Sequence, residues 1–422
     1  MKFIPFKRFV QSRKGGAWGQ DAGKDEVDVS CVRVADFEYD KLTSKKILST
    51  IRSIPARQYK NIKLNKGDIL IEKSGGGEAT LVGRAISFDQ EIDTICSNFI
   101  ERIEIKTNKL EPKFACYILA SAYSNKINAS CIKQTTGIQN LDVDAYLSSV
   151  LVPDIPKEKQ RRIVDFLESK IKDISDSIFK KRVCLQKLSE YRQSLITQAV
   201  TKGLDPNVEM KDSGVEWIGH IPQSWSVPQV KYLFSVVCGA TPSPSESNWG
   251  GDIAWIGPSD MEDARMIDHG ARFLTSIGYK SCGTELVPVG SLILSTRAPI
   301  GKVAYACREL CTNQGCKSLV PRQNIETKYF YYVLQAMRSL LEKEGSGTTF
   351  MELSTSSLGS QKLPLPSNKE QIAIADYLDK KLKQLQITLD TTKKSIDRLT
   401  EYRTSLISAA VTGKIDISEV NQ

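Results

Sequence analysis

The sequence predicts an α+β protein in which two mixed α/β units are separated by a pair of long antiparallel coiled-coil helices. Three observations predict this fold. A long segment around residue 191 recurs 211 residues later, and the 422-residue chain is twice that length. Both copies of the segment carry apolar residues in a heptad pattern. The residues before each copy alternate short β-rich runs with turns, as at 27–34 and 252–256.

The repeat is a tandem duplication. Residues 190–196 (EYRQSLI) recur as residues 401–407 (EYRTSLI), and the offset holds without a gap from Gln160/Gln371 to Asp205/Asp416. Solenoid repeats have periods of about 20–50 residues, so this is one large unit written twice. Such a protein is suited to a ligand that has two related parts.

The repeated segment predicts a helix with an apolar seam. Positions a hold Val164, Ile171, Ile178, Leu185, Arg192 and Ala199 in the first copy, and Ala375, Leu382, Leu389, Ile396, Arg403 and Ala410 in the second. Positions d hold Leu167, Ile174, Lys181, Leu188 and Leu195, then Leu378, Leu385, Thr392, Leu399 and Leu406. The polar d positions Lys181 and Thr392 match between copies, as do Arg192 and Arg403. A polar seam residue usually sets register at some cost in stability.

The helix ends are marked by proline and glycine. Pro156 or Pro366 precedes each helix and Gly203 or Gly413 follows it, which predicts roughly 40 residues, or about 60 Å. A single apolar stripe must be buried, and its own copy is the obvious partner, in antiparallel orientation. The alternatives are a helical hairpin within one domain and an intermolecular dimer. The long intervening sequence favours a rod with a globular domain at each end.

Composition places few limits on function. The apolar fraction of 41% and the charged fraction of 25% are ordinary. No run approaches the roughly 18 apolar residues of a membrane span, and the start lacks a signal peptide, so we expect a cytoplasmic protein with no membrane partner. The net charge of +9 mildly favours a polyanion partner. The ten cysteines form no metal-binding pattern, so we expect buried small hydrophobes and no metal site.

The two globular units are only weakly alike. Residues 67–71 match 290–294, 83–84 match 301–302, 96–98 match 311–313, and 136–141 match 348–353. The most basic stretch, residues 41–66, contains eight Lys or Arg and no acid, whereas residues 262–285 are nearly neutral. Solvated surface and phosphate contact are both open for the basic stretch.

Enzyme motifs are missing from the sequence. There is no amino-methyltransferase Asn/Asp-Pro-Pro-Tyr run and no Gly-Lys-Ser/Thr phosphate loop. Glu104-Ile105-Lys106 resembles a fragment of a nuclease site, but its alternation predicts a strand with Ile103 and Ile105 inward. The two histidines lie in polar sequence without a nucleophile elbow. We therefore expect a non-catalytic chain.

The chain resembles the specificity subunit of type I restriction–modification systems over nearly its whole length. The resemblance rests on the run 211–222 (KDSGVEWIGHIP), the runs 239–243 and 249–256, and the paired EYR-x-SLI helix ends. The run 211–222 has no counterpart before the first unit. Pro5 is the position equivalent to Pro228, so the sequence begins only a few residues before that point. A short, truncated or alternative start is consistent with this.

The resemblance implies a DNA-recognition subunit. Each of two target recognition domains recognises one half of a bipartite, asymmetric double-stranded DNA site. The helices set the spacing and scaffold two methyltransferase (M) subunits, and restriction/translocase (R) subunits join them. S-adenosylmethionine and ATP with Mg²⁺ are then expected on the partners and no cofactor in this chain. The implied domains are 1–152 (recognition domain 1), 153–205 (helical region 1), 206–362 (linker and recognition domain 2) and 363–422 (helical region 2).

Base recognition needs hydrogen-bonding side chains that reach the major groove. The DNA-binding candidates are Lys45, Lys46, Arg52, Arg57, Lys60, Lys73, Arg84, Gln134 and Gln139 in the first unit, and Ser243, Ser259, Arg297, Lys302, Asn313, Gln314 and Thr349 in the second. Tyr191 and Tyr402 join the seam residues as candidates for scaffolding partner subunits. The alternative is a non-catalytic coiled-coil scaffold with two ligand-binding domains and no DNA role.

Overall fold

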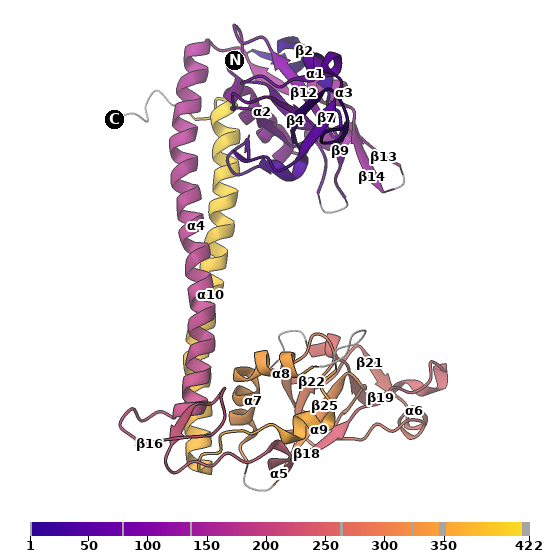
Figure 1. The fold of residues 1–422 in the computed structure, drawn as a ribbon, viewed down its shortest axis with the longest axis vertical. Helices are drawn as coiled ribbons and strands as arrows, with labels where there is room; N and C mark the ends of the chain where they lie inside the picture. Colours follow the sequence, from indigo (N-terminus) through magenta and orange to yellow (C-terminus); the bar gives the residue numbers. More distant parts are fainter. Residues whose placement is uncertain are drawn as a thin grey trace. The chain divides into compact units, whose positions relative to one another are not determined.

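The computed structural model describes residues 2–77, 80–135, 137–261, 265–322, 325–345 and 352–415. It contains two compact units: residues 1–183 with 392–422, and residues 184–391. Each unit holds β-sheets, short helices and one part of each of two long helices (Figure 1). The predicted α+β fold with a long antiparallel helix pair is confirmed.

The first unit is built on a six-stranded sheet. Its order is β2 (Val10–Gly15), β12 (Ile100–Ile105), β8 (Ile69–Glu72), β10 (Ala85–Ser87), β6 (Thr43–Ser44) and β5 (Phe37–Glu38). In β8, Ile69 and Ile71 enter the core that includes α2 (Pro112–Ser124), while Leu70 enters a core on the other face. A central strand buried on both faces explains why the three consecutive residues Ile69–Ile71 of β8 are all apolar.

Smaller sheets complete this unit. One has the order β11 (Thr94–Cys96), β4 (Val27–Val32), β7 (Ile51–Ile54) and β3 (Gln20–Asp21). Another joins β13 (Ile132–Thr135), β14 (Ile138–Leu141) and β9 (Ser74–Gly75), and β1 (Phe3–Pro5) pairs with β15 (Leu151–Pro153). The short helices are α1 (Ala56–Ile62) and α3 (Val143–Ser149).

The second unit repeats the main sheet. Its order is β18 (Phe234–Cys238), β25 (Cys316–Pro321), β22 (Leu292–Ser295), β23 (Val303–Ala306) and β20 (Met266–Ile267). A second sheet joins β21 (Arg272–Leu274), β19 (Trp249–Ile256) and β24 (Cys311–Thr312), and β16 (Met210–Asp212) pairs with β17 (His220–Pro222). The helices are α5 (Val230–Leu233), α6 (Ser276–Lys280), α7 (Thr327–Ala336), α8 (Arg338–Glu344) and α9 (Thr355–Ser360).

The weak parallels in sequence fall at equivalent strands. Residues 67–71 and 290–294 lead into β8 and β22, while 83–84 and 301–302 precede β10 and β23. Both central strands pair antiparallel with the strands that follow these dipeptides. The described residues of 136–141 and 348–353 also match, since Leu141 N donates to Lys73 O at 2.8 Å and Leu353 N to Thr296 O at 2.9 Å.

The long helices are α4 (Lys157–Lys202) and α10 (Asn368–Val411). They begin one or two residues after Pro156 and Pro366, and they end before Gly203 and Gly413, which both have φ of 73°. A left-handed residue after the last turn is a common helix terminator and favours glycine. At 46 and 44 residues the helices are slightly longer than predicted.

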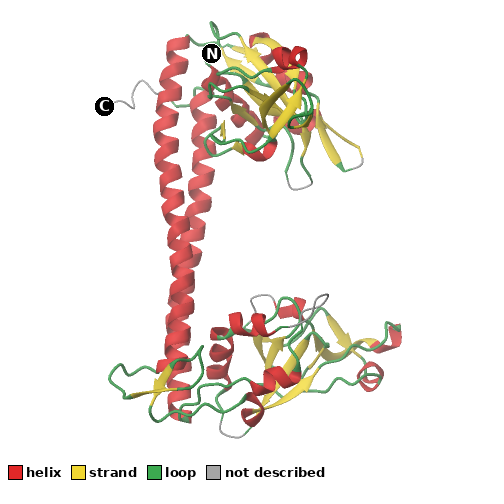
Figure 2. Ribbon diagram, in the orientation of Figure 1, coloured by secondary structure: helices red, strands yellow, loops and turns green. Residues whose placement is uncertain are grey.

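The predicted seam is buried towards both ends of the helix pair, and most of its middle positions are half-buried. In the first unit, Leu167, Ile174 and Ile178 of α4 share a core with Leu406 and Ala410 of α10. In the second unit, the end of α4 (Ile196, Ala199, Val200) shares a core with the start of α10 (Ile374, Ala375, Leu378). Early residues of one helix therefore meet late residues of the other, so the pairing is antiparallel, and Figure 2 shows both helices as continuous.

One polar contact occurs identically in both units. The Gln160 side chain is 2% exposed, and its Oε1 accepts the Glu111 backbone N–H at 2.9 Å, directly before α2. Gln371 is 1% exposed and accepts the Glu326 N–H at 2.9 Å, directly before α7. Each amide also donates backward, Gln160 to Ile155 O and Gln371 to Pro366 O. We call this contact the glutamine joint.

Other predictions have mixed outcomes. Glu104 lies in β12 with Ile103 and Ile105 buried, as the alternation predicted. Six cysteines are buried, but the prediction is wrong for Cys184 and Cys238, which are exposed. Cys184 lies on the solvent side of α4, where periodicity and not residue type decides burial. Among the described helices, none is both long and apolar enough to cross a bilayer.

Candidate nucleic-acid interface

The basic stretch 41–66 is largely occupied by ion pairs. Lys41 pairs with Glu38 at 3.2 Å and Lys45 with Asp36 at 3.7 Å. Lys63 pairs with Asp93 at 2.5 Å, which lowers the pKa of that carboxyl, and Lys66 pairs with Glu91 at 2.8 Å. The acids lie outside the stretch in sequence, so its charge is much less concentrated in the fold than in the chain.

Arg52 is the most deeply engaged of these cations. Its guanidinium pairs with Asp21 at 2.6 Å, donates to the backbone oxygens of Trp18 and Gly19, and lies 4.6 Å from the Trp18 ring centroid. Its side chain is 13% exposed. These contacts hold the segment around β3 against β7, so Arg52 organises the loop and presents little of its own surface.

Six cations of the stretch are exposed, and Lys41, Lys45 and Lys66 among them are held in the ion pairs above. Arg57 and Lys60 project from α1, and Lys46 lies in the loop after β6. In α1 the two cations are three residues apart and thus on neighbouring positions of one helix face. Together with Lys45, which is paired with Asp36, they are the exposed basic candidates of this stretch.

The edge of the β9–β14–β13 sheet carries the remaining first-unit candidates. Gln134 is exposed on β13. Gln139 is buried: its Oε1 accepts the Val82 N–H at 3.2 Å and its Nε2 donates to Gly77 O at 3.0 Å. Gln139 therefore fixes the adjoining loop. The Lys73 side chain is half-buried, with its Nζ beside Gly15.

Arg84 lies in a partly buried cluster with aromatic rings. Its guanidinium lies 4.4 Å from the Tyr39 ring centroid, and its Nε donates to the Tyr123 hydroxyl at 3.2 Å. Glu72 nearby is 5% exposed, and burial raises its pKa to about 7 although Arg84 opposes the shift. Sequence reasoning missed Glu72, since an acid at the end of an apolar strand normally indicates a solvated turn.

The equivalent edge in the second unit holds Arg297. Its backbone pairs with that of Glu352, as Ser74 pairs with Asn140 in the first unit. The Arg297 guanidinium contacts the Glu352 carboxylate at 2.9 Å, and Lys317 reaches the same carboxylate at 3.4 Å. Burial opposes ionisation of Glu352, but the two cations hold its pKa below the usual range. Thr349 lies outside the described residues.

Four second-unit candidates lie between β18 and β25, three of them in loops and Ser259 in a short 3-10 helix at Pro258–Met261. Ser259 is exposed. The Ser243 hydroxyl accepts from Asn248 at 2.9 Å, Asn313 Oδ1 accepts the Gly315 N–H at 2.8 Å, and Gln314 Oε1 accepts from the Thr241 hydroxyl. These hydrogen bonds brace the loops, and the Gln314 side chain stays exposed.

Arg272 is a cation that sequence reasoning missed. Its guanidinium carbon lies 3.2 Å from the Trp249 ring centroid and 6.0 Å from that of Trp255. The two tryptophans of the run 249–256 were the available signal, but it is a β-bulge between Trp249 and Ile253, and not their spacing, that brings the ring centroids of Trp249 and Trp255 to 5.1 Å. The arginine that stacks there comes from β21, a pairing that sequence alone did not reveal.

Lys302 belongs to a cavity of about 290 Å³ beside α4. Arg192, Tyr331 and Arg338 also line it. Arg192 donates to Gln386 of α10 at 3.3 Å, whereas its repeat equivalent Arg403 pairs with Asp40 at 2.5 Å. The matched seam arginines therefore have different partners in the two units.

Tyr191 and Tyr402 lie outside the buried seam. They are 56% and 55% exposed, at equivalent positions one residue before Arg192 and Arg403. The seam positions Lys181, Leu188, Leu195, Thr392 and Leu399 are half-buried, and Leu385 is buried. Each long helix thus exposes a tyrosine to solvent at the equivalent position of the repeat. Within the described ranges, no group of three or more His, Cys, Asp or Glu side chains is placed to hold a metal ion.

Comparison with known proteins gives one consistent family. The sequence model of the "Type I restriction modification DNA specificity domain" matches residues 10–181 and 222–398. The chain is 37% identical over 182 residues to the MjaIX specificity subunit of Methanocaldococcus jannaschii, covering 40% of this chain and 42% of that one. It is 23% identical over 399 residues to the putative MjaX specificity subunit of the same organism, covering 93% and 89%.

Solved structures agree in fold. A chain from a study of assembly and conformational transition of the type I R-M system superposes with a TM-score of 0.75, covering 97% of both chains at 17% identity. The HsdS subunit of Thermoanaerobacter tengcongensis gives a TM-score of 0.56 at 17% identity, covering 98% of this chain and 97% of that one.

Proposed function

We propose a DNA-recognition function from the premise that this chain belongs to the type I restriction–modification DNA specificity family. In this proposal the chain is the non-catalytic, cytoplasmic specificity subunit of a multi-subunit methyltransferase and endonuclease. Residues 1–152 and 206–362 are the recognition domains, and each recognises one half of a bipartite, asymmetric double-stranded DNA site. Residues 153–205 and 363–422 are the helical regions.

The observation that carries the proposal is the uneven divergence of the two units. The order of five strands of the main sheet and the glutamine joint are shared. The side chains at the sheet edges differ, with Ser74 and Asn140 in one unit where Arg297 and Glu352 stand in the other. A constant scaffold with different edges is suited to recognising two different DNA sequences.

The exposed candidates are assigned the DNA contacts. Lys46, Arg57 and Lys60 are proposed to neutralise phosphates, because their charges are available at the surface. Gln134, Ser259 and Gln314 are exposed hydrogen-bonding side chains suited to base edges. For the remaining described candidates we propose DNA contacts whose geometry depends on the loops that these residues hold in place: Lys45, Arg52, Lys73, Arg84, Gln139, Ser243, Arg297, Lys302 and Asn313. For Thr349 we propose a DNA contact from the second unit.

The long helices are proposed to set the spacing and to hold partner subunits. Helices of 46 and 44 residues are about 66–69 Å long, whereas one turn of DNA is about 34 Å. Tyr191 and Tyr402, exposed at equivalent positions, favour a single kind of partner that docks twice, namely two M subunits. R subunits join that complex. S-adenosylmethionine and ATP with Mg²⁺ are assigned to the partners.

A gel-shift experiment tests the function. The chain, reconstituted with its methyltransferase subunits, should bind its target DNA specifically, and log K should fall steeply and linearly with log salt concentration. Methylation sequencing of a host that carries the complex identifies the target. If the reconstituted complex binds no DNA, the coiled-coil scaffold with two ligand-binding domains becomes the better description.

A further inference from the structure

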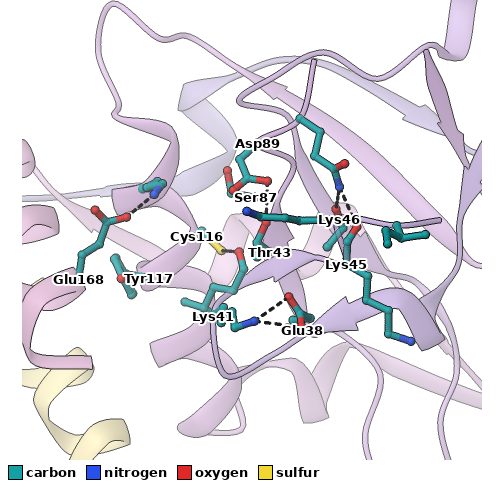
Figure 3. Close-up of a pocket in the computed structure, with 15 residues that line it drawn as sticks. Glu38, Lys41, Thr43, Lys45, Lys46, Ser87, Asp89, Cys116, Tyr117 and Glu168 are labelled. Carbon is teal, nitrogen blue, oxygen red and sulfur yellow. Dashed lines mark hydrogen bonds and ion pairs between the residues drawn. The ribbon is translucent and has the colours of Figure 1, made fainter. Parts of the chain in front are cut away.

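The first unit contains a cavity whose lining, apart from Lys45 and Lys46, takes no part in the proposed DNA contacts. Its volume is about 880 Å³, and it lies between the loop before β6, the strand β10 and the helices α2 and α4 (Figure 3). Leu42, Ser87, Cys116, Tyr117 and Glu168 form one side of it. All of these residues lie within one unit.

The backbone of this cavity has an equivalent in the second unit. In the first unit the Ser87 N–H donates to Leu42 O at 2.9 Å, and Ser87 pairs in parallel with Thr43. In the second, the Tyr305 N–H donates to Arg265 O at 3.0 Å, and Tyr305 pairs in parallel with Met266. Leu42 therefore corresponds to Arg265, and Ser87 to Tyr305.

The helices give the other correspondences. The glutamine joint shows that Glu111 and Glu326 are equivalent positions. Counting along α2 and α7 from there makes Cys116 equivalent to Tyr331, and Tyr117 equivalent to Tyr332. The 211-residue repeat pairs Glu168 of α4 with Asp379 of α10. Five residues that line the cavity thus have five known equivalents.

In the second unit these equivalents enclose an arginine. The Arg265 guanidinium carbon lies 5.3–5.5 Å from the ring centroids of Tyr305, Tyr331 and Tyr332. It forms an ion pair with the Asp379 carboxylate at 2.5 Å, and the Tyr332 hydroxyl donates to the same carboxylate. Aromatic faces and a carboxylate are the standard surroundings of a guanidinium.

In the first unit the acid and one tyrosine remain, but the arginine and the other two tyrosines are replaced by smaller residues. Leu, Ser and Cys stand where Arg, Tyr and Tyr stand in the second unit, while Tyr117 and Glu168 are kept as Tyr and an acid. The loss of side-chain volume accounts for the cavity. A carboxylate and an aromatic ring are left facing space that an arginine fills in the other copy.

We propose that this cavity binds an arginine side chain that a partner protein inserts, in the place that Arg265 fills from within the second unit. The Glu168 carboxylate accepts the guanidinium and the Tyr117 ring packs against its face. The choice of a cation follows from the retained acid. The choice of arginine over lysine follows from the stacking geometry of the equivalent site.

The surrounding charges permit a cation there. Lys113, Lys41 and Lys45 of the lining are paired with Glu168, Glu38 and Asp36 in turn. An inserted guanidinium would therefore share the Glu168 carboxylate with Lys113, as Arg297 and Lys317 share that of Glu352. The Asp89 carboxylate accepts the Thr43 hydroxyl at 2.8 Å and adds a negative charge to the lining. Lys46 also lines the cavity, as Figure 3 shows, and it is the competing internal cation.

Titration calorimetry of the full-length protein tests the proposal without DNA. The probe is N-acetyl-arginine methylamide, with the citrulline analogue as its neutral isostere and the lysine analogue as the point charge. We expect the arginine probe to bind at least about tenfold more tightly than the citrulline probe, since one charge-assisted hydrogen bond is worth that factor. Equal binding of the two probes overturns the proposal.

Two variants locate the binding. Leu42→Arg supplies the side chain that the second unit already has and should abolish probe binding while the protein remains folded. Glu168→Gln changes an exposed helix position and should remove the preference for arginine over citrulline. If both variants bind the probe as the wild type does, the ligand lies elsewhere and the proposal fails.

A converse variant and two controls complete the test. Arg265→Ala should open the equivalent site, so that a second equivalent of the arginine probe binds and restores lost thermal stability. If only Lys46→Ala and not the wild type binds the probe, Lys46 is the resident cation and no partner is needed. Binding of inorganic phosphate in place of the arginine probe also overturns the proposal. DNA binding by Leu42→Arg is read separately, so failure here leaves the DNA-recognition function untouched.

Discussion

Arg297 and Glu352 show how one residue pair can set local recognition. The guanidinium lies over the sheet edge with 41% of the side chain exposed, while the carboxylate is shared with Lys317. An arginine at such an edge is held in place by its ion pair and still has guanidinium N–H groups that can donate to DNA. The role of Arg297 in recognition then depends on the same ion pair that fixes its orientation.

Arg297→Ala should therefore alter recognition of the second DNA half-site only. We expect a loss of about 1–3 kcal/mol of discrimination there, and no change at the first half-site. The measurement is binding to DNA with each half-site varied separately. Arg57→Ala, at a proposed phosphate contact of the first unit, is the contrasting variant and should weaken binding to all sequences about equally. A change at the first half-site on Arg297→Ala would contradict recognition by separate domains.

Glu72 makes the free energy of unfolding depend on pH. Its pKa in the folded chain is about 7, above the ordinary 4.5, because burial disfavours the carboxylate. Between these values the folded state holds a proton that the unfolded state has lost, so stability falls as pH rises from about 4.5 to 7 and is constant above. A neutral side chain removes this loss.

Glu72→Gln should stabilise the protein by about 3 kcal/mol above pH 7 relative to wild type, and by little near pH 4.5. Thermal unfolding of both proteins at pH 5 and pH 8 measures the difference. A difference that is the same at both pH values would show that the carboxyl does not titrate with folding.

At the scale of elements, the long helices follow directly from local sequence. Heptads, a preceding proline and a terminal glycine act within a few residues, so the starts at Lys157 and Asn368 could be predicted closely. The basic stretch 41–66 could not be interpreted in this way. Its partners Asp93 and Glu91 approach through strand pairing that only the fold supplies. Glu72 and Arg272 were missed for the same reason.

Lys181→Leu tests the polar seam position. Lys181 is half-buried at a d position of α4, so a leucine there should raise the melting temperature by about 2–4 °C while weakening the specification of register. Lys180→Leu, at the exposed neighbouring position, is the control and should bring no gain. A lower melting temperature for Lys181→Leu would mean that the residue does not face the seam.

At the scale of the whole molecule, the duplication predicts that spacing and sequence recognition are separable. The seam residues lie on α4 and α10, whereas the candidate DNA contacts lie on the sheets, loops and short helices of the two units. A change in helix length should therefore act on the distance between half-sites and not on their sequences.

Matched seven-residue insertions beside Lys181 and Thr392 should lengthen both helices by about 10 Å. The recognised spacer should grow by about three base pairs at about 3.4 Å each, with both half-site sequences unchanged. Methylation sequencing of a host with the altered chain gives the new spacer. An insertion in α4 alone should shift the seam and abolish specific binding, whereas unchanged spacing in the double insertion would contradict the proposed role of the helices.

The glutamine joint has a genetic consequence. Gln160 and Gln371 hold their units through main-chain atoms, at Glu111 and at Glu326, so the bond is indifferent to the side chains it meets. A gene segment exchanged by recombination at these two codons would therefore encode a recognition domain that can form the same hydrogen bond to the helix. New pairings of half-sites could then arise in one crossover, without any compensating mutation in the helices.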